Sequence, residues 1–233
     1  MDRIGMVTVG QAPRDDLVPF MTPLFTRPVA VLQAGALDDL RLREIEALGP
    51  GPGEVGIAAR LRDGSETLLS HAKILPRVQA CVDRLRAGGA ELLIVLCGAD
   101  WSALRSDVLV VNPGRVFPAI ISALASGRRL GVIKPSAGQI EQAHRQFAER
   151  GIEAVVTSAS PYTGEQRLDD VRRAAEPLAA ARVDLVWMTC VGMDEAMREI
   201  VVEVTGRPTI LARSILARVI DELLAAGRVP AAT

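Results

Sequence analysis

The sequence is poor in aromatic residues and has no excess charge of either sign. Aromatic residues make up 3% of its 233 residues, and 27 basic side chains against 28 acidic ones leave a formal net charge of −1. A balanced chain of this kind lacks the broad basic surface that nucleic acids and anionic membranes attract. We therefore expect neither nucleic acid nor a membrane among its partners.

The chain has too few cysteines and histidines for a disulfide framework or a Cys/His metal site. The chain has three cysteines, Cys81, Cys97 and Cys190, and two histidines, His71 and His144. The cysteines are odd in number and far apart, and none belongs to a CxxC pair, so a disulfide framework is not expected. A Cys/His zinc site would need more ligands at closer spacing. The sequence therefore predicts no metal.

Long apolar runs and phosphate-binding loops are also missing. No apolar run approaches the roughly 20 residues that a membrane-spanning helix needs, and the N-terminal residues lack a signal-peptide pattern, so we expect a cytoplasmic protein. No GxGxxG or Walker-type loop follows a predicted strand. The Gly/Pro-rich residues 49–53 have no strand before them and no helix after them, which indicates a linker. We therefore expect no cofactor.

Two stretches of the sequence have the same pattern, in which an acid precedes an apolar run and a cysteine and a glycine follow it. Glu91-Leu-Leu-Ile-Val-Leu-Cys97 is followed directly by Gly98, and Asp184-Leu-Val-Trp-Met-Thr-Cys190 has Gly192 two positions further on. Short continuous apolar runs are typical of strands buried on both faces of a parallel sheet. The sequence thus predicts two buried strands that each deliver one thiol to a loop.

Strand and helix patterns alternate along the chain, which predicts an α/β fold with mainly parallel sheet. Strands are expected at residues 4–9, 29–33, 91–97, 108–111, 129–133, 154–157, 184–190 and 209–211, with a hairpin at 56–69. Helices are expected after residues 10–14, within 35–48, and at 74–85, 112–127, 137–150, 164–181, from 194, and at 213–226. Pro13 suits the first turn of the first helix, and Asp38 suits the cap of the second.

The order of these elements repeats. Arg3-Ile-Gly-Met-Val7 matches Arg129-Leu-Gly-Val-Ile133, and the two cysteine strands match each other. The helices that follow match at positions offset by one hundred: Ile120, Leu124, Gly127 and Arg128 correspond to Ile220, Leu224, Gly227 and Arg228. We infer two similar α/β lobes related by a pseudo-twofold axis. Residues 1–114 with the returning helix of residues 213–233 form the first, and residues 115–212 form the second.

The predicted geometry suits proton transfer. Ligands of open α/β sheets bind beyond the carboxyl ends of the strands, where both cysteine loops are expected. If the lobes face each other across a cleft, Cys97 and Cys190 can remove a proton from one face of a carbon and return it to the other. A thiol is a base only as its thiolate, so its pKa of about 8.5 must fall, and a nearby helix N-terminus is one means.

Four short motifs occur in order along the chain: Thr8-Val-Gly-Gln-Ala-Pro-Arg14, Leu96-Cys97, Ser160-Pro-Tyr162 and Cys190-Val-Gly192. Together they resemble the AroM family, which is similar to the aspartate/glutamate racemase superfamily, and the resemblance covers nearly the whole chain. It implies two flavodoxin-like lobes with the active site between them. In the wider superfamily the two cysteines are catalytic in cofactor-independent racemases and in maleate isomerases, and decarboxylases use one. The AroM branch itself implies no particular activity.

The resemblance also implies residues that bind a small carboxylate, which lie in four loops. These candidates are Gly10, Gln11, Arg14, Gly98, Asp100, Ser160, Tyr162, Val191 and Gly192. Arg14 can hold a carboxylate with two parallel hydrogen bonds, or it is a solvated arginine in a first helical turn. Tyr162 either binds substrate or packs its ring in a turn.

The sequence departs from the racemase pattern beside both cysteines. Gly98-Ala99-Asp100 replaces a polar Thr/Asn-type pair, and Val191 replaces a threonine, so donors for a substrate carboxylate are lost. Asp100 adds a charge that would repel a carboxylate and raise the pKa of a thiol. Backbone N–H groups around Gly98 and Gly192 remain as donors.

Two functions therefore stay open. The first is a cofactor-independent racemase or isomerase of a small carboxylate that uses Cys97 and Cys190. The second is a non-catalytic protein that binds or senses a small carboxylate, in which these thiols are small buried side chains that end core strands. A homodimer is the default assembly for either.

Overall fold

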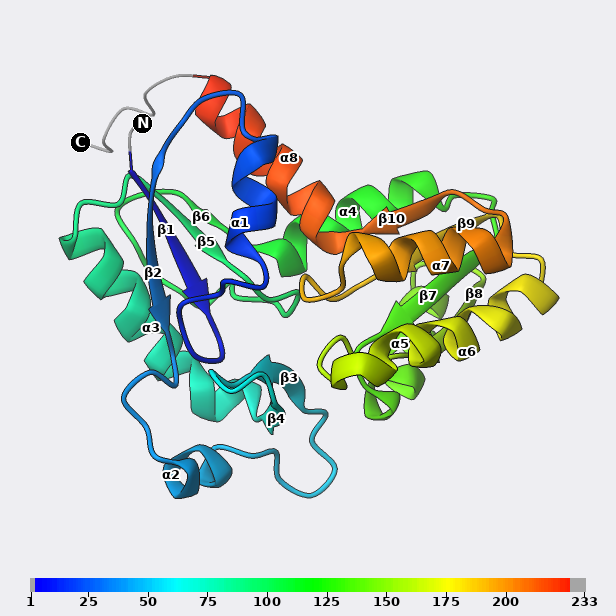
Figure 1. Ribbon diagram of the computed structural model, residues 1–233, viewed down its shortest axis with the longest axis horizontal. Coiled ribbons are helices and arrows are strands. Elements are labelled where there is room, and N and C mark those ends of the chain that lie inside the picture. Colours follow the sequence, from blue (N-terminus) through cyan, green and yellow to red (C-terminus); the bar gives the residue numbers. More distant parts are fainter. Residues whose placement is uncertain (1–2, 227–233) are drawn as a thin grey trace. The chain divides into compact units, whose positions relative to one another are not determined.

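The computed structural model describes residues 3–226, which form two compact units (Figure 1). One unit contains the residues up to Val116 and those from Leu216 onward, and the other is Phe117–Ile215. The division falls inside two helices, α4 (Pro113–Leu124) and α8 (Ala212–Ala225). The predicted match at Gly227 and Arg228 lies outside the described residues. No helix within residues 3–226 has the length and apolar character to cross a bilayer.

The first unit contains a parallel four-stranded sheet in the order β2-β1-β5-β6. Its strands are β1 (Arg3–Thr8), β2 (Ala30–Gly35), β5 (Leu92–Val95) and β6 (Val110–Val111). Its helices are α1 (Val18–Met21), the 3-10 helix η1 (Thr22–Leu24), α2 (Leu42–Ala47) and α3 (His71–Ala87). The predicted hairpin is present as β3 (Ile57–Arg60) and β4 (Glu66–Leu69), which pair antiparallel.

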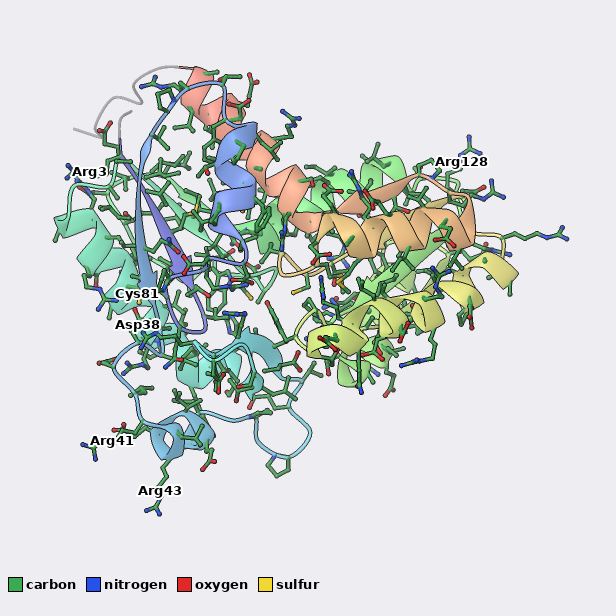
Figure 2. All side chains as sticks on the ribbon, in the orientation of Figure 1. Arg3, Asp38, Arg41, Arg43, Cys81 and Arg128 are labelled. Atoms are coloured by element: carbon green, nitrogen blue, oxygen red, sulfur yellow. The ribbon has the colours of Figure 1, made fainter. Side chains whose placement is uncertain are left out.

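The helix α3 packs along one face of this sheet because its apolar residues recur at helical spacing (Figure 1). The buried residues on that stripe are Ile74, Val78, Cys81, Val82 and Leu85. Cys81 lies in the core, as its spacing predicts, and burial raises the pKa of its thiol (Figure 2). Gly5 on β1 permits the close packing, since a Cβ there would lie 3.1 Å from Leu85 Cβ on α3 and 2.7 Å from Leu93 Cδ2 on β5.

The second unit contains another parallel four-stranded sheet, in the order β10-β9-β7-β8. Its strands are β7 (Leu130–Lys134), β8 (Ala154–Ser158), β9 (Leu185–Met188) and β10 (Thr209–Leu211). Its helices are η2 (Ala137–Gln139), α5 (Ile140–Ala148), η3 (Gly164–Gln166), α6 (Arg167–Ala180) and α7 (Glu195–Thr205). The helices α6 and α7 pack against each other.

The two sheets repeat one design. Read from its other edge, the second sheet runs β8-β7-β9-β10, so β7 corresponds to β1 and β9 to β5. Gly131 on β7 takes the place of Gly5, and a Cβ there would lie 3.1 Å from Val183 and 3.2 Å from Leu178. Each cysteine follows the strand that pairs with the first strand of its unit. The predicted α/β fold with two similar, mainly parallel sheets is confirmed.

The helix predicted directly after β1 is wrong. The Ala12–Pro13 peptide is cis, and the backbone N–H groups of this segment donate to other segments instead of to carbonyls four residues earlier. The N–H of Gln11 donates to Arg60 O (3.1 Å), and that of Arg14 to Gln33 Oε1 (2.8 Å). Residues 10–16 therefore form a loop, and α1 begins only at Val18.

The cap predicted at Asp38 is also wrong. Its carboxylate accepts hydrogen bonds from the N–H of Ala12 (2.7 Å) and from the N–H of Gly35 (2.7 Å). Asp38 thus joins the loop after β1 to the end of β2, and α2 begins later, with Arg41 as its N-cap.

Candidate functional site

Cys190 lies in a half-buried loop directly after β9, between that strand and α7. The N–H of Gly192 points at Cys190 Sγ at 3.4 Å, and the Tyr162 hydroxyl lies 4.0 Å from the same sulfur. An N–H that faces a sulfur can donate a hydrogen bond to it, and a thiolate accepts such a bond more strongly than a thiol. The fold thus brings a backbone N–H and a phenol hydroxyl to the Cys190 sulfur.

Tyr162 follows β8, and its position depends on Gly192. The N–H of Tyr162 donates to Ser160 Oγ (3.1 Å), which fixes the turn that carries the ring. A Cβ on Gly192 would lie 2.3 Å from the Tyr162 hydroxyl oxygen and 2.7 Å from its Cζ. Only glycine permits this approach, so Gly192 lets the phenol reach the cysteine loop.

Arg213 holds the backbone of the same loop, and Asp194 caps the helix that follows it. Arg213, only 5% exposed, donates from Nε to Val191 O (3.1 Å) and from Nη2 to Gly192 O (3.0 Å). Asp194 is the N-cap of α7, and its carboxylate pairs with Arg167 at 3.2 Å. The backbone between Cys190 and α7 is therefore fixed by side chains from outside the loop.

Cys97 lies in the corresponding loop after β5 and is more deeply buried, at 9% exposure. Its carbonyl accepts a hydrogen bond from the indole N–H of Trp101 (3.3 Å). The N–H of Trp101 donates to Asn112 Oδ1 (3.1 Å), and Asn112 Nδ2 donates to Asp100 Oδ1 (2.8 Å). Gly98, between the cysteine and this network, is exposed.

The Asp100 carboxylate stabilises the turn that contains it. Its carboxylate accepts hydrogen bonds from the N–H of Ser102 (2.9 Å), from the Ser102 hydroxyl and from Asn112. The hydrogen bond from the Ser102 hydroxyl, with a smaller contribution from Asn112, holds the pKa of Asp100 below its usual value. Local donors therefore already satisfy the negative charge that the sequence places near Cys97.

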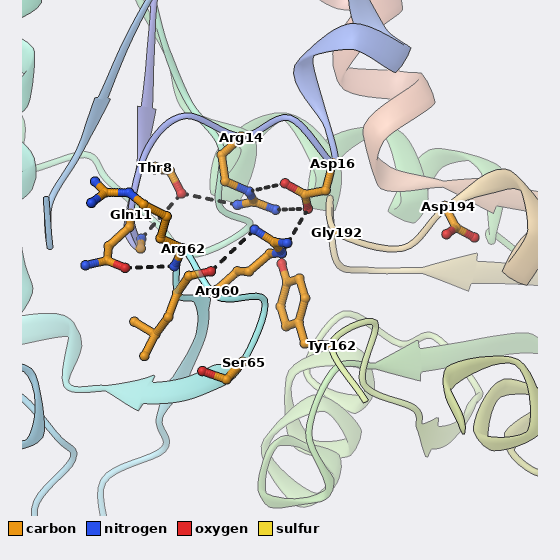
Figure 3. Close-up of polar contacts among 12 residues, drawn as sticks. Thr8, Gln11, Arg14, Asp16, Arg60, Arg62, Ser65, Tyr162, Gly192 and Asp194 are labelled. Carbon is orange, nitrogen blue, oxygen red and sulfur yellow. Dashed lines mark hydrogen bonds and ion pairs between the residues drawn. The ribbon is translucent and has the colours of Figure 1, made fainter. Parts of the chain in front are cut away.

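The loop after β1 packs against the hairpin of β3 and β4, and Gly10 and Gln11 make this contact (Figure 3). A Cβ on Gly10 would lie 2.1 Å from Arg60 O, so the two backbones touch. Gln11 accepts a hydrogen bond from the N–H of Arg62 at Oε1 (2.7 Å) and donates from Nε2 to Leu37 O (3.3 Å). The Gln11 amide thereby joins the hairpin to the loop after β2.

Arg14 is buried in this loop and pairs with Asp16 (Figure 3). Its Nε and Nη2 each donate to an Asp16 oxygen at 2.8 Å, and its Nη1 donates to Thr8 Oγ1 at 3.2 Å. Burial alone would raise the pKa of Asp16, but the hydrogen bonds and charge of Arg14, with the charge of Arg60, lower it below its usual value. At 2% exposure Arg14 is not the solvated arginine that the sequence left open.

Comparison with known proteins identifies the family. The family model described as AroM protein matches residues 4–224. The chain belongs to the AroM family. The resemblance inferred from the four motifs is thus confirmed. Among curated proteins, none matches the sequence.

Solved structures show that this AroM-family chain has the fold of the aspartate/glutamate racemases. An aspartate racemase from Picrophilus torridus has a TM-score of 0.58 at 12% identity, with 97% of this chain and 95% of that chain covered. A glutamate racemase from Francisella tularensis subsp. tularensis SCHU S4, in complex with D-glutamate, has a TM-score of 0.58 at 14% identity, with 97% and 81% covered. An arylmalonate decarboxylase has a TM-score of 0.57 at 18% identity, with 99% and 95% covered.

Within each unit of this AroM-family chain, the predicted site residues gather at the carboxyl edge of the sheet. The second unit brings together Ser160, Tyr162, Cys190, Val191 and Gly192, whereas the first has Gly10, Gln11 and Arg14 after β1 and Cys97, Gly98 and Asp100 after β5. Sequence reasoning missed Asp16, Arg60 and Arg213. Of these three, only Asp16 could have been suspected from the sequence, because it lies two positions from Arg14. Within residues 3–226, no three His, Cys, Asp or Glu side chains are placed to hold a metal ion.

Proposed function

We propose that this AroM-family protein is a cofactor-independent racemase or isomerase of a small carboxylate, with Cys190 as its base and Cys97 as its second acid–base group. The observation that carries the proposal is the environment of Cys190. Cys190 is half-buried, and its sulfur faces the N–H of Gly192 at 3.4 Å and lies 4.0 Å from the Tyr162 hydroxyl. A thiol needs such donors to be a base near neutral pH.

The proposed reaction transfers one proton in and one proton out. The Cys190 thiolate takes a proton from the carbon next to a carboxylate and becomes a thiol, while the electron pair of the broken C–H bond moves into the carboxylate. The electron pair then returns from the carboxylate to that carbon and forms a new C–H bond on the opposite face with the proton of the Cys97 thiol, which is left as a thiolate. Backbone N–H groups, such as that of Gly98, are the proposed donors for the substrate carboxylate, since stabilising the added charge lowers the barrier.

The names of other proteins with this fold support a proposal for the substrate class. Aspartate, glutamate and arylmalonate are the compounds named for the three solved structures, and all three are small carboxylates. We accordingly propose small dicarboxylates and acidic amino acids as the first compounds to test.

Exchange of substrate hydrogen with deuterated solvent tests the proposal. We expect the wild-type protein to replace the hydrogen next to the carboxylate with deuterium, which proton NMR detects as a lost signal. Cys190→Ser is expected to slow this exchange by about 100-fold or more, the usual contribution of a positioned acid or base. Cys81→Ala, which changes a thiol in the core of the first unit, is the matched control and keeps the wild-type rate.

The Cys97 variant separates the two roles. Cys97→Ser is expected to stop inversion of configuration and to keep some exchange through Cys190, since one base suffices to remove a proton. The same rate of exchange in Cys190→Ser as in wild type would sink the proposal.

The second candidate function is a non-catalytic protein that binds a small carboxylate. It is favoured by the residues after both cysteines, because Gly98 has no side chain and Val191 is apolar and buried. This candidate predicts that a carboxylate raises the melting temperature and that the rise survives replacement of both Cys97 and Cys190. It also predicts no exchange with deuterated solvent.

A further inference from the structure

One peptide unit lies between a buried cation and the Cys190 thiol. The carbonyl oxygen of Val191 accepts a hydrogen bond from Arg213 Nε at 3.1 Å. The other end of the same peptide is the N–H of Gly192, which faces Cys190 Sγ at 3.4 Å. Guanidinium, peptide and sulfur thus form a continuous chain of hydrogen bonds.

This chain favours a negative charge on the sulfur. An arginine keeps its positive charge at every pH at which proteins fold. A cation at the carbonyl end of an amide polarises it and makes its N–H a stronger donor, and such cooperative effects are larger where water is excluded. Arg213 is buried, at 5% exposure, so its charge acts on the peptide with little screening by solvent.

The loop has little freedom to move away from this arrangement. A second bond from Arg213 Nη2 to Gly192 O (3.0 Å) fixes the following peptide as well. The Tyr162 ring lies against the Cα of Gly192, where even a methyl group would clash. The N–H of Gly192 is therefore held toward the sulfur from both sides.

In the first unit, the position that corresponds to Arg213 by the offset of one hundred is Pro113, the first residue of α4. Asn112, directly before it, holds the loop after Cys97 through the N–H of Trp101 (3.1 Å). In the second unit the loop after Cys190 is held by Arg213, the second residue of α8. A neutral amide supports one cysteine loop, and a charged guanidinium supports the other.

We infer that Arg213 is a positioning residue that stabilises the Cys190 thiolate through the Val191–Gly192 peptide. The use of this thiolate in catalysis rests on the proposed function. The stabilisation itself does not, because it is a property of the thiol without substrate.

The pH dependence of alkylation tests the inference. Cys190 is alkylated with iodoacetamide over a range of pH, and mass spectrometry of the native protein follows the rate. Arg213→Gln is expected to raise the midpoint by about one pH unit. This shift corresponds to a tenfold smaller thiolate fraction below the midpoint, or about 1.4 kcal/mol. Arg213→Lys keeps the charge and is expected to shift it less. Arg172→Gln, which removes an exposed arginine paired with Glu203 in the same unit, leaves the midpoint unchanged.

A merely structural role for Arg213 gives a different result. It would lower the melting temperature or change the limiting rate at high pH, and the midpoint would stay at its wild-type value. An unchanged midpoint in Arg213→Gln overturns the inference and leaves the proposed function standing. A raised midpoint without any substrate exchange in the wild type supports the inference and counts against the proposed function.

The wild-type protein provides the test if Arg213→Gln does not fold. The NMR signals of the Gly192 N–H and the Arg213 Nε–H are followed through the titration of Cys190. Both are expected to move with the same midpoint as alkylation, because they belong to one chain of hydrogen bonds. An Arg213 Nε–H signal that stays constant through that midpoint overturns the inference.

Discussion

Replacing Asp16 with asparagine removes the carboxylate that pairs with Arg14 inside the loop after β1. Arg14 is 2% exposed, and it holds Asp16 through two hydrogen bonds of 2.8 Å. The substitution keeps the size of the side chain and leaves a buried guanidinium facing a neutral amide. It therefore tests whether this pair stabilises the loop.

The size of the effect follows from burial. Removing one partner of a fully buried ion pair costs about 3–5 kcal/mol, and a hydrogen bond to a charged group contributes about 1.5–3 kcal/mol. The Asp16 side chain is 25% exposed, so water offsets part of the loss. We expect Asp16→Asn to lower the free energy of unfolding by about 2–3 kcal/mol at pH 7, in line with these figures.

The effect also has a predicted pH dependence. The pKa of Asp16 in the folded protein lies below the ordinary value of 3.8. A carboxyl with a lowered pKa stabilises the fold above its unfolded-state pKa, and this contribution is lost as the pH falls through the folded-state pKa. The difference between wild type and Asp16→Asn is therefore full at pH 7, begins to shrink as the pH falls below about 4 and disappears below the folded-state pKa.

Urea unfolding at a series of pH values measures this difference. Asp107→Asn is the control, because it removes an exposed carboxylate, 65% accessible, from a pair with Arg86, and it is expected to change little. A loss below about 0.5 kcal/mol at pH 7, the size typical of surface substitutions, would refute the reasoning. So would a difference that stays constant from pH 7 into the acid range.

Two further predictions concern the loops after β1 and β9. Gly10→Ala places a methyl group 2.1 Å from Arg60 O, so urea unfolding should show a loss of about 1–3 kcal/mol, whereas Gly138→Ala, with its nearest neighbour at 3.9 Å, should be nearly neutral. Equal stability of the two variants would show that the contact at Gly10 relaxes freely. Tyr162→Phe keeps the ring against Gly192 and removes the hydroxyl near Cys190, so deuterium exchange should slow by roughly tenfold at an unchanged melting temperature. An exchange rate equal to wild type would exclude a role for that hydroxyl.

The sequence predicts the sheets well because the information is local. Buried parallel strands need continuous apolar runs, and the two cysteine runs begin at an acid, Glu91 or Asp184, and end near a glycine, Gly98 or Gly192. The duplication is visible because packing demands a glycine at the same place in both halves, Gly5 and Gly131. The positions of Cys97 and Cys190 after matching strands follow from the same repeat.

The sequence predicts the loops poorly because their partners are distant. Residues 10–14 have helix-compatible composition, but Arg60, Gln33 and Asp38 take their N–H groups, and no local pattern reveals those partners. Arg213 begins a helix that a hydrophobic pattern predicts, and its contact with Val191 spans 22 positions. Such long-range hydrogen bonds become visible only once the fold is known.

Alkylation of the three thiols in one native wild-type sample tests whether Cys190 is the activated thiol. Mass spectrometry follows Cys190, Cys97 and Cys81 over the same range of pH, with buried Cys81 as the internal reference for an unreactive core thiol. We expect a midpoint for Cys190 below the ordinary thiol value of about 8.5. A Cys190 midpoint at or above about 8.5 would contradict it.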